Sequence, residues 1–371
     1  MLLNWDILTD AMSFLDRADA SRMSRACRTL LQAAPVVLLR GEIFLWTPWR
    51  LLSFYRFMSR AEHTGSPYQY LRQLKLTYSG RWLNTIPQFG KLITEIFEHA
   101  TELQSLKVYG SDVLEADDRT APAVAVLTKL YSLEIHDLTE STFHILKMMH
   151  APLTKIEIAL FGFTNPVDPT PVLLRFTDTL QTLDVSNAVF MSTDVQYPHL
   201  STLTTQFCFF NELRPVVHCF PNLQVLHMHT INEETSTSME IEWRRLASVA
   251  SQEHCSWTSL HRLSGSVLCL YMLGVQCRVD HLKLASAMGT AEDSRRLTMV
   301  LSDAHPASLD LALTLPDFNV SLLAGALAPV THILTQLMLH LEFHGIVYED
   351  PRPRIVSVIP SNFAVLLTTS C

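Results

Sequence analysis

A six-residue pattern of apolar positions, Leu-x-x-Leu-x-Leu, recurs along the chain from residue 71 onward. Eight copies have an apolar residue at all three positions, and three more copies lack one of the three. The middle positions of the eleven copies are Leu74, Leu106, Leu133, Ile156, Leu183, Leu203, Leu226, Leu263, Leu282, Leu309 and Leu337. The mean step between them is about 26 residues, which is a period typical of short repeats that stack on one another.

The segments between these copies have the pattern of helices. Residues such as Ile93, Ile96 and Phe97 share one face at helical spacing. Proline often stands just before the next copy, where it ends a helix and holds the chain extended. Each period therefore predicts one short strand followed by one helix. Such a unit cannot bury its own apolar faces, so we expect neighbouring units to stack into one continuous core.

This period and pattern resemble those of leucine-rich repeats. The resemblance implies an α/β fold in which residues 61–371 form a curved solenoid of about 10–11 irregular repeats, with short parallel strands on the concave side and helices on the convex side. A purely helical repeat array is the rival architecture. The Leu-x-Leu alternation and the β-branched residues in its third position favour a strand in each unit.

Residues 1–60 show a different pattern, and we interpret them as a separate small helical domain. Leu8, Ala11, Met12 and Leu15 fall on one helical face. Asp19 is a suitable N-cap for a second helix that Pro35 would end or kink. These residues carry eight arginines and no lysine, for a net charge of +3, whereas the rest of the chain carries −11. The shift in charge and the polar run at 61–67 predict a boundary near residue 60.

Three segments of this domain resemble the F-box family, in its fungal form that also carries leucine-rich repeats. They are residues 3–8 (Leu-Asn-Trp-Asp-Ile-Leu), residues 12–15 (Met-Ser-Phe-Leu) and residues 26–30 (Ala-Cys-Arg-Thr-Leu). Residues 35–40 and 52–58 resemble the linker of the same fungal proteins. Two positions depart from the family pattern: Asn4 stands where proline is usual, and Ala11 stands where a larger aliphatic residue is usual.

The resemblance implies a role in a Skp–cullin–F-box ubiquitin ligase. The head would bind a Skp-type adaptor that bridges to a cullin, and the repeats would hold a protein substrate, with no catalytic residue in the chain. The positions that the resemblance places against the adaptor are Leu3, Leu8, Ala11, Met12, Leu15, Met23 and Cys27. An apolar helical face without a mate in its own chain is suited to such a partner groove. The alternatives are that these residues pack on the downstream domain, or that the chain is an interaction scaffold whose degenerate head has no ligase role.

Composition narrows the remaining classes. The net charge of −8 weighs against a nucleic-acid partner, because such proteins usually present a basic face. The seven cysteines form no C-x-x-C pair, which indicates reduced thiols and a cytoplasmic or nuclear protein. We see no signal peptide. Residues 318–341 lack charged side chains, but their polar residues and Pro329 favour a buried helix and strand over a membrane span.

Candidate chemistry is sparse. The chain has no phosphate-binding loop, no nucleophile elbow and no H-E-x-x-H motif, so we expect no cofactor, no metal and no catalytic role. His227 and His229 would share a strand face, but they lack a third ligand at suitable spacing. Trp46 and Trp49 are expected to pack at the junction between the head and the first repeat. The polar run at 232–238 is interpreted as a solvated insertion, with a recognition loop as the alternative.

Overall fold

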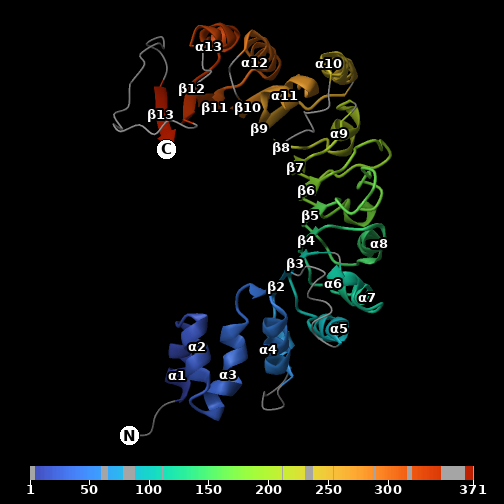
Figure 1. The fold of residues 1–371 in the computed structure, drawn as a ribbon, viewed down its shortest axis with the longest axis vertical. Coiled ribbons are helices and arrows are strands. Elements are labelled where there is room, and N and C mark those ends of the chain that lie inside the picture. Colours follow the sequence, from blue (N-terminus) through green and yellow to red (C-terminus); the bar gives the residue numbers. More distant parts are fainter. Residues whose placement is uncertain are drawn as a thin grey trace. The chain divides into compact units, whose positions relative to one another are not determined.

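The computed structural model describes residues 5–59, 66–77, 88–110, 112–210, 212–229, 237–253, 255–286, 290–315, 320–343 and 364–370. The contacts divide the chain into two compact units. Unit 1 comprises residues 1–165 and 172–180, and unit 2 comprises residues 166–171 and 181–371. The fold is α/β, as expected, and both units are built from parallel strands and the helices that connect them (Figure 1).

Unit 1 holds strands β1 to β5 and helices α1 to α8. The head helices are α1 (Trp5–Ser13), α2 (Arg17–Ser24), α3 (Arg28–Leu38) and α4 (Pro48–Met58). The strands are β1 (Ile43–Leu45), β2 (Gln73–Thr77), β3 (Ser105–Tyr109), β4 (Ser132–His136) and β5 (Lys155–Ala159). The remaining helices are α5 (Phe89–His99), α6 (Asp112–Glu115), α7 (Thr120–Ala125), α8 (Glu140–Met148) and the 3-10 helices η1 (Pro67–Tyr70) and η3 (Leu174–Phe176).

Unit 2 holds the remaining strands and helices. The strands are β6 (Thr182–Ser186), β7 (Thr202–Gln206), β8 (Val225–His229), β9 (Ser259–Ser266), β10 (Arg278–Ser286), β11 (Ser308–Leu315), β12 (Gln336–Phe343) and β13 (Ala364–Ser370). The helices are α9 (Arg214–Cys219), α10 (Ser238–Gln252), α11 (Val267–Leu273), α12 (Ala291–Ala304), α13 (Val320–Leu327) and the 3-10 helix η5 (Ala328–Val330).

The strand register confirms the repeat pattern. All eleven predicted middle positions lie on strands, one on each strand from β2 to β12. Within unit 1, Leu74 pairs with Leu106, Leu106 with Leu133, and Leu133 with Ile156. Within unit 2 the matching positions pair in the same way from β6 to β12, all in parallel. A leucine-to-leucine register places every apolar side chain of the pattern on the same face of the sheet.

These leucines form the core of each unit, because the helices cover the strand face on which they lie. The middle position is at most 3 % exposed in every strand from β2 to β12. In unit 1 the helices α5, α7 and α8 lie on one side of β2 to β5, and in unit 2 the helices α9 to α13 lie on one side of β8 to β12 (Figure 1). Each fully buried leucine contributes about 1.5–3 kcal/mol relative to an exposed one. The opposite face of the strands carries mainly polar side chains.

A left-handed residue ends several strands. Gly110, Asp137, Asn187 and Phe207 directly follow β3, β4, β6 and β7, and each has a positive φ. Glycine, aspartate and asparagine adopt this conformation more readily than other residues. Phe207 is the exception, with φ 53°, and the backbone bond from its N–H to the carbonyl of His229 helps to hold it there (3.2 Å).

Two connections depart from the expected unit of one strand and one helix. Residues 160–181 contain the 3-10 helix η3 and no α-helix, and residues 187–201 contain no helix. In unit 2 the carboxylate of Asp168 organises this region instead. It accepts hydrogen bonds from the backbone N–H groups of Thr170, Met191 and Ser192 (2.8–3.0 Å). The Tyr197 hydroxyl donates to the carbonyl of Thr170 (2.6 Å), so side chains satisfy backbone groups that a helix would pair internally.

The head begins with three short helices rather than the expected two. Asp16, not Asp19, caps α2, because its side chain accepts from the N–H of Asp19 (2.8 Å). The chain then breaks at Cys27, whose extended backbone starts α3. Pro35 lies inside α3 instead of ending it. The break lets α2 and α3 fold back on each other around a core of Met12, Ala20 and Ala34, so packing overrides the continuous helical pattern.

The linker after the head is not wholly helical. Residues Ile43–Leu45 form β1, which pairs in parallel with β2 through Phe44 and Lys75. This first strand therefore comes from residues that we expected to belong to the helical domain at 1–60. The Arg17 guanidinium donates to the carbonyl of Glu42 (2.6 Å), which ties the start of α2 to this strand.

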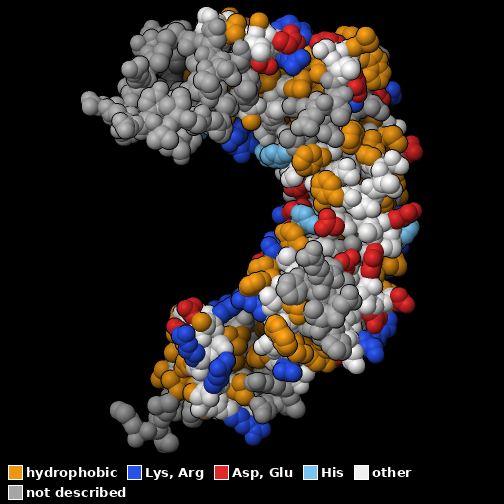
Figure 2. Space-filling model, in the orientation of Figure 1, with side chains coloured by type: hydrophobic (Ala, Val, Ile, Leu, Met, Phe, Trp, Pro, Cys, Tyr) orange, Lys and Arg blue, Asp and Glu red, His pale blue; other side chains and the backbone are white. Residues whose placement is uncertain are grey.

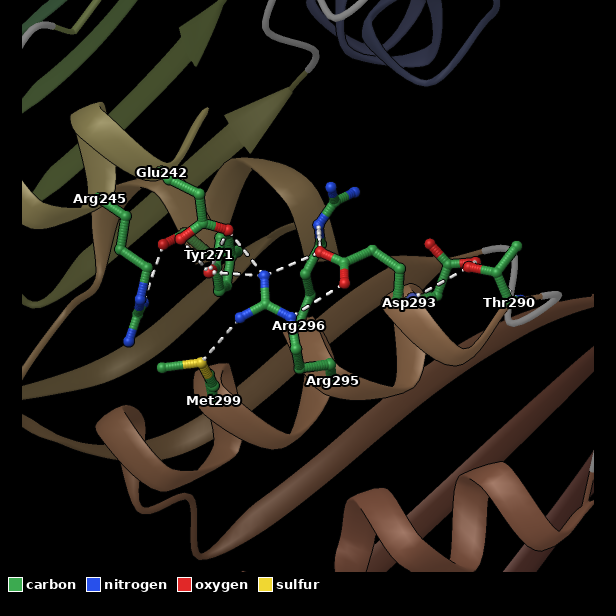
Figure 3. Close-up of polar contacts among 9 residues, drawn as sticks. Glu242, Arg245, Tyr271, Thr290, Asp293, Arg295, Arg296 and Met299 are labelled. Atoms are coloured by element: carbon green, nitrogen blue, oxygen red, sulfur yellow. Dashed lines mark hydrogen bonds and ion pairs between the residues drawn. The ribbon is translucent and has the colours of Figure 1, made fainter. Parts of the chain in front are cut away.

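A polar clamp joins the helices α10, α11 and α12 in unit 2 (Figure 3). Arg295 of α12 contacts Glu242 of α10 (2.7 Å), the Tyr271 hydroxyl of α11 (3.0 Å) and Glu292 (2.8 Å). Arg245 of α10 is 6 % exposed and pairs with Asp303 of α12 (2.7 Å). Arg244, the neighbouring residue, is partly exposed, whereas Arg245 is buried because Asp303 and the carbonyl of Tyr271 accept its hydrogen bonds.

Two further expectations concern the charge-poor stretch at 318–341 and the cysteines. Among the described residues, no helix has the length and apolar character needed to cross a bilayer. The charge-poor stretch contains α13 and β12, which confirms the helix and the strand, but α13 is only partly buried, with Ser321, Ala324 and Gly325 exposed. The six cysteines within the described ranges are free thiols, and Cys371 lies outside those ranges. Burial raises the pKa of Cys208 and of Cys219 to about 12, so these thiols are unreactive at neutral pH.

Candidate functional site

The structure separates the seven residues that the family resemblance places against an adaptor. Leu3 lies outside the described residues. Ala11 and Leu15 are exposed, whereas Leu8, Met23 and Cys27 are half-buried. Met12 is fully buried at 0 % exposure. The sequence pattern therefore grouped residues that face solvent with residues that face the interior of the head.

Met12, which we expected to contact the adaptor, is instead buried in the core of the head. Its side chain packs with Ala20 and Ala34, and Met23, Val37 and Leu38 pack against this cluster. A surface role for Met12 is excluded by this burial, and Met23 is partly committed to the same core.

A different apolar stripe of the head faces solvent. Ile7 is 64 % exposed and Phe14 is 87 % exposed, and Ala11 lies between them in the sequence. Ile7 and Ala11 are four residues apart on α1 and share one of its faces, and Phe14 directly follows the end of that helix. Leu15 and Val36 add exposed apolar area at 39 % and 47 %. Figure 2 shows hydrophobic side chains beside Lys and Arg side chains over the helices of the head. Ile7 and Phe14 were within the matched segments, but only the folded head distinguishes them from Met12.

A second candidate site is the polar strand face of unit 1, on the side that the helices leave open. We call it the strand-face cluster and define it as Glu42, Phe44, Lys75, Lys107, Tyr109, Glu134, His136 and Glu157. Parallel pairing places Lys75 beside Lys107, Lys107 beside Glu134, and Glu134 beside Glu157. Side chains two residues apart on one strand share a face, so Tyr109 and His136 form a second row beside the first.

Glu134 is the centre of this cluster. Its side chain is 8 % exposed. One carboxylate oxygen accepts from the Tyr109 hydroxyl and lies 3.2 Å from His136 Nε2. The other oxygen lies 3.4 Å from Lys107 Nζ. Lys107 also lies 3.5 Å from Glu42, and His136 Nε2 lies 3.5 Å from Glu157.

These contacts shift the pKa values of the cluster in opposite directions. Burial acts to raise the pKa of Glu134, but the hydrogen bonds from His136 and Tyr109 and the charge of Lys107 lower it to about 2. The hydrogen bonds of His136 to Glu134 and Glu157 raise the pKa of the imidazole to about 9. At neutral pH the cluster thus holds ionised carboxylates, a protonated histidine and Lys107 in one network.

Titration of His136 is a direct check on this network. We expect the pKa of the imidazole to be about 9 in the folded chain, against its ordinary value of 6.5. In a Glu134→Gln variant the midpoint should move back toward 6.5, since the largest stabilising partner of the charged imidazole is lost. Histidine ring resonances in an NMR titration measure both midpoints. Glu98→Gln, which changes an exposed ion pair elsewhere in unit 1, should leave the His136 midpoint unchanged.

The sign of the stability effect follows from the same shifts. The raised pKa of His136 stabilises the fold fully below pH 6.5, and this contribution is lost as the pH rises through 9. The lowered pKa of Glu134 stabilises the fold above pH 4.5, and this contribution is lost as the pH falls toward 2. The free energy of unfolding should therefore fall on either side of pH 4.5–6.5 in the wild type, and Glu134→Gln should flatten that profile.

An aromatic group borders the strand-face cluster. The Phe44 and Trp46 rings lie 6.4 Å apart, Lys75 lies over Phe44 (5.2 Å) and over Tyr109 (4.7 Å), and Arg50 lies over Trp46 (4.7 Å). Trp49 is 76 % exposed and Trp46 is 46 % exposed. The expected packing role is wrong for Trp49, and these two rings instead offer exposed apolar area beside charged groups.

The histidine pair on the open strand face of unit 2 matches its prediction only in part. His227 and His229 share a face of β8, with ring centres 6.4 Å apart. His227 Nδ1 contacts Ser264 Oγ (2.5 Å) rather than another ligand. Burial, and then the charges of Arg262, His229 and Lys283, lowers the pKa of His227. Most of the insertion at 232–238 lies outside the described residues, and Ser238 starts α10.

Sequence reasoning missed the strand-face cluster of unit 1. Glu134 and His136 stand two residues apart, but Glu157 and Lys107 come from neighbouring strands, and only the register brings them together. The pattern that located the strands also gives this register, so pairing the three repeats at Leu106, Leu133 and Ile156 would have aligned these polar residues.

Comparisons with known proteins do not assign a family. No protein-family model matches the chain, and no curated protein matches it significantly.

Proposed function

We propose that this chain is the substrate-receptor subunit of a Skp–cullin–F-box ubiquitin ligase, acting in the cytoplasm or nucleus. The head would bind a Skp-type adaptor, and the open strand faces of the repeats would hold a protein substrate. The chain would contribute no reacting side chain. It would accelerate ubiquitin transfer by raising the effective concentration of the substrate and orienting it.

The observation that carries this proposal is the exposed apolar stripe of Ile7, Ala11 and Phe14 within a segment that resembles an F-box. A solvent-exposed phenylalanine at 87 % on a small helical head is costly to leave uncovered. An amphipathic helix that lays such a stripe into a partner groove is a common mode of recognition. The family resemblance suggests the Skp-type adaptor as the partner. The exposure of the stripe means that its side chains are accessible to such a partner.

The strand faces support the second half of the proposal. Exposed aromatic rings beside an arginine, such as Trp46 under Arg50, are typical of protein interfaces, where aromatic residues and arginine are enriched. Side chains on the strands stand on backbone held by parallel pairing, so they are already ordered before a partner arrives. Less side-chain freedom is then lost on binding.

A repeat scaffold without ligase function is the second candidate. The observation that favours it is the small apolar area that two of the expected adaptor-binding positions expose. Met12 is buried, and Ala11 presents a single methyl group. Asn4 is a further departure from the family pattern. In this alternative the head would only cap the first repeats, and the chain would bind proteins without recruiting a cullin.

Binding of the full-length chain to a purified Skp-type adaptor separates the two candidates. We expect the wild type to form a complex that co-elutes in size-exclusion chromatography, and an Ile7→Asp/Phe14→Asp variant to bind at least about 30-fold more weakly. Each aspartate would place a charge in an apolar groove, and interface anchors are worth about 2 kcal/mol or more. Biolayer interferometry with immobilised adaptor measures the dissociation constants.

A matched control uses the exposed apolar stripe of α10 in unit 2. Met239 is 82 % exposed and Trp243 is 59 % exposed, so Met239→Asp/Trp243→Asp makes the same change away from the head and should keep wild-type affinity. An Ala11→Leu variant should bind several-fold more tightly, because it restores the larger aliphatic residue. Absence of wild-type binding would overturn the ligase proposal and leave the scaffold. Equal weakening by both aspartate pairs would show that the stripe is not the interface.

A further inference from the structure

Three metal-ligating side chains meet within the strand-face cluster of unit 1. One donor atom each from Glu134, His136 and Glu157 lies within 4.8 Å of the other two. Glu134 and His136 come from β4, and Glu157 comes from the neighbouring strand β5. Among the described residues this is the one set of three or more such groups that converges in this way.

The spacing of these atoms differs from that of strong hydrogen bonds. His136 Nε2 lies 3.2 Å from Glu134 Oε1 and 3.5 Å from Glu157 Oε1. Hydrogen bonds between charged partners usually measure about 2.7–2.9 Å. In a tetrahedral zinc centre with bonds of about 2.0–2.1 Å, neighbouring ligand atoms lie about 3.3–3.4 Å apart. The two distances from His136 Nε2 bracket the edge of such a tetrahedron, and the donor oxygens of Glu134 and Glu157 lie within 4.8 Å of each other.

The surroundings would hold these ligands in place. Tyr109 donates to Glu134, and its ring stacks on the His136 ring at 4.3 Å with an interplanar angle of 9°. Lys107 pairs with the second oxygen of Glu134 and balances part of the acidic charge. Groups that hydrogen-bond a ligand and orient it typically strengthen metal binding 10- to 100-fold. Parallel pairing of Glu134 with Glu157 sets the distance between the two carboxylates through the backbone.

We propose that Glu134, His136 and Glu157 form a binding site for a divalent transition-metal ion of the zinc type, with three protein ligands and one open position. The ion takes the place of the proton on His136 Nε2, and this proton is released to solvent on binding. The imidazole favours zinc, cobalt or nickel over magnesium and calcium, which prefer all-oxygen sites. His136 and Glu157 are 31 % and 27 % exposed at their side chains, so the open position reaches solvent on the strand face. A water molecule would occupy the open position of the metal when no partner is bound, and a donor group of a partner protein could replace that water.

The site does not depend on the ligase proposal, because it uses no residue of the head. It differs from the expectation that the chain holds no metal site. That expectation considered His227 and His229 and did not include the pairing of β4 with β5.

The test is calorimetric titration of the full-length chain with zinc chloride, together with cobalt absorption spectroscopy. We expect one equivalent of zinc to bind to the wild type, and cobalt to give the intense visible bands of a four-coordinate site without a thiolate charge-transfer band. His136→Gln and Glu157→Gln should each weaken this site at least about 10-fold, and Tyr109→Phe should weaken it about 10-fold through loss of the orienting hydroxyl.

His281→Gln is the matched control, since His281 is an exposed strand histidine of unit 2; it should leave the affinity and the spectrum unchanged. Circular dichroism and thermal melting verify that each variant is folded, and if one ligand variant fails to fold, the other ligand variant decides. No stoichiometric binding by the wild type would overturn the proposal. So would a thiolate band, or binding that survives both ligand substitutions in folded protein.

Discussion

Replacing Arg245 with methionine is expected to lower the free energy of unfolding of unit 2 by about 3–5 kcal/mol at pH 7. The side chain is 6 % exposed. It pairs with Asp303 (2.7 Å). It also donates to the carbonyl of Tyr271 (2.9 Å) and lies over the Tyr271 ring at 4.6 Å (Figure 3). Methionine fills similar volume but leaves the carboxylate of Asp303 and a backbone carbonyl without their donor. An uncompensated buried charge costs far more than the pair contributes.

The pH dependence of this loss has a definite sign. Burial already raises the pKa of Asp303, and Arg245 opposes that rise. Without Arg245 the pKa of Asp303 should rise further, so the carboxyl takes up a proton in mildly acidic solution and the buried charge disappears. The stability deficit of Arg245→Met should therefore be largest at neutral pH and smaller near pH 5. Urea unfolding, with hydrogen exchange of α10 to α12 followed by mass spectrometry, measures it locally.

Two further variants identify the cause of the deficit. Arg244→Met removes a partly exposed pair with Glu240 on the same helix, and it should cost less than about 1 kcal/mol. Arg245→Met/Asp303→Leu removes both charges and should regain most of the lost stability, because apolar pairs can replace buried ion pairs. A double variant as unstable as Arg245→Met would show that packing of the arginine, and not the unpaired aspartate, dominates.

The second large effect is expected for Gly90→Ala, which should destabilise unit 1 by about 3 kcal/mol. A Cβ atom at Gly90 would lie 2.2 Å from the carbonyl oxygen of Ala116 and 2.6 Å from its carbonyl carbon. That obstacle is backbone, so no rotamer change relieves it. The helix α5 would have to move away from Ala116, which directly follows α6. That shift would disturb the buried contact between the Thr94 hydroxyl of α5 and the Thr120 hydroxyl of α7 (2.7 Å).

Gly325→Ala is the control of opposite sign. Gly325 lies inside α13, and a Cβ atom there would meet no other atom within 4 Å. Alanine is the better helix former, so this variant should gain about 0.5–1 kcal/mol. Thermal melting of both variants decides the point. A Gly90→Ala chain as stable as the wild type would mean that α5 and the backbone at Ala116 are farther apart in solution.

The repeat architecture was predictable because its signal is redundant. Eleven copies of one apolar pattern each locate a strand, so an error at a single copy does not alter the register. The helical connections carried less information. The loops around Asp168 replace helices, and their hydrogen bonds join residues about 23 positions apart. A local sequence pattern cannot predict hydrogen bonds between residues so far apart.

The candidate sites were predictable only to the level of a segment. Spacing predicts which residues share a helical face. However, two faces of α1 are apolar, and spacing alone does not say which of them is buried in the core of the head. Met12 enters the core because Ala20 and Ala34 are small enough to leave it room. Ile7 and Phe14 then remain outside. Arg245 shows the same limit, since its burial depends on Asp303, 58 positions later in the chain.

By itself, the sequence determined the α/β class, the strand positions and the repeat register of this protein, because each follows from apolar periodicity that every repeat restates. It also indicated the head, through local resemblance. Only the tertiary structure decided which apolar residues of the head face solvent, that β1 joins the sheet, and that Glu134, His136 and Glu157 meet. Those outcomes depend on contacts between residues distant in the chain, whose side chains compete for the same interior space and the same charged partners.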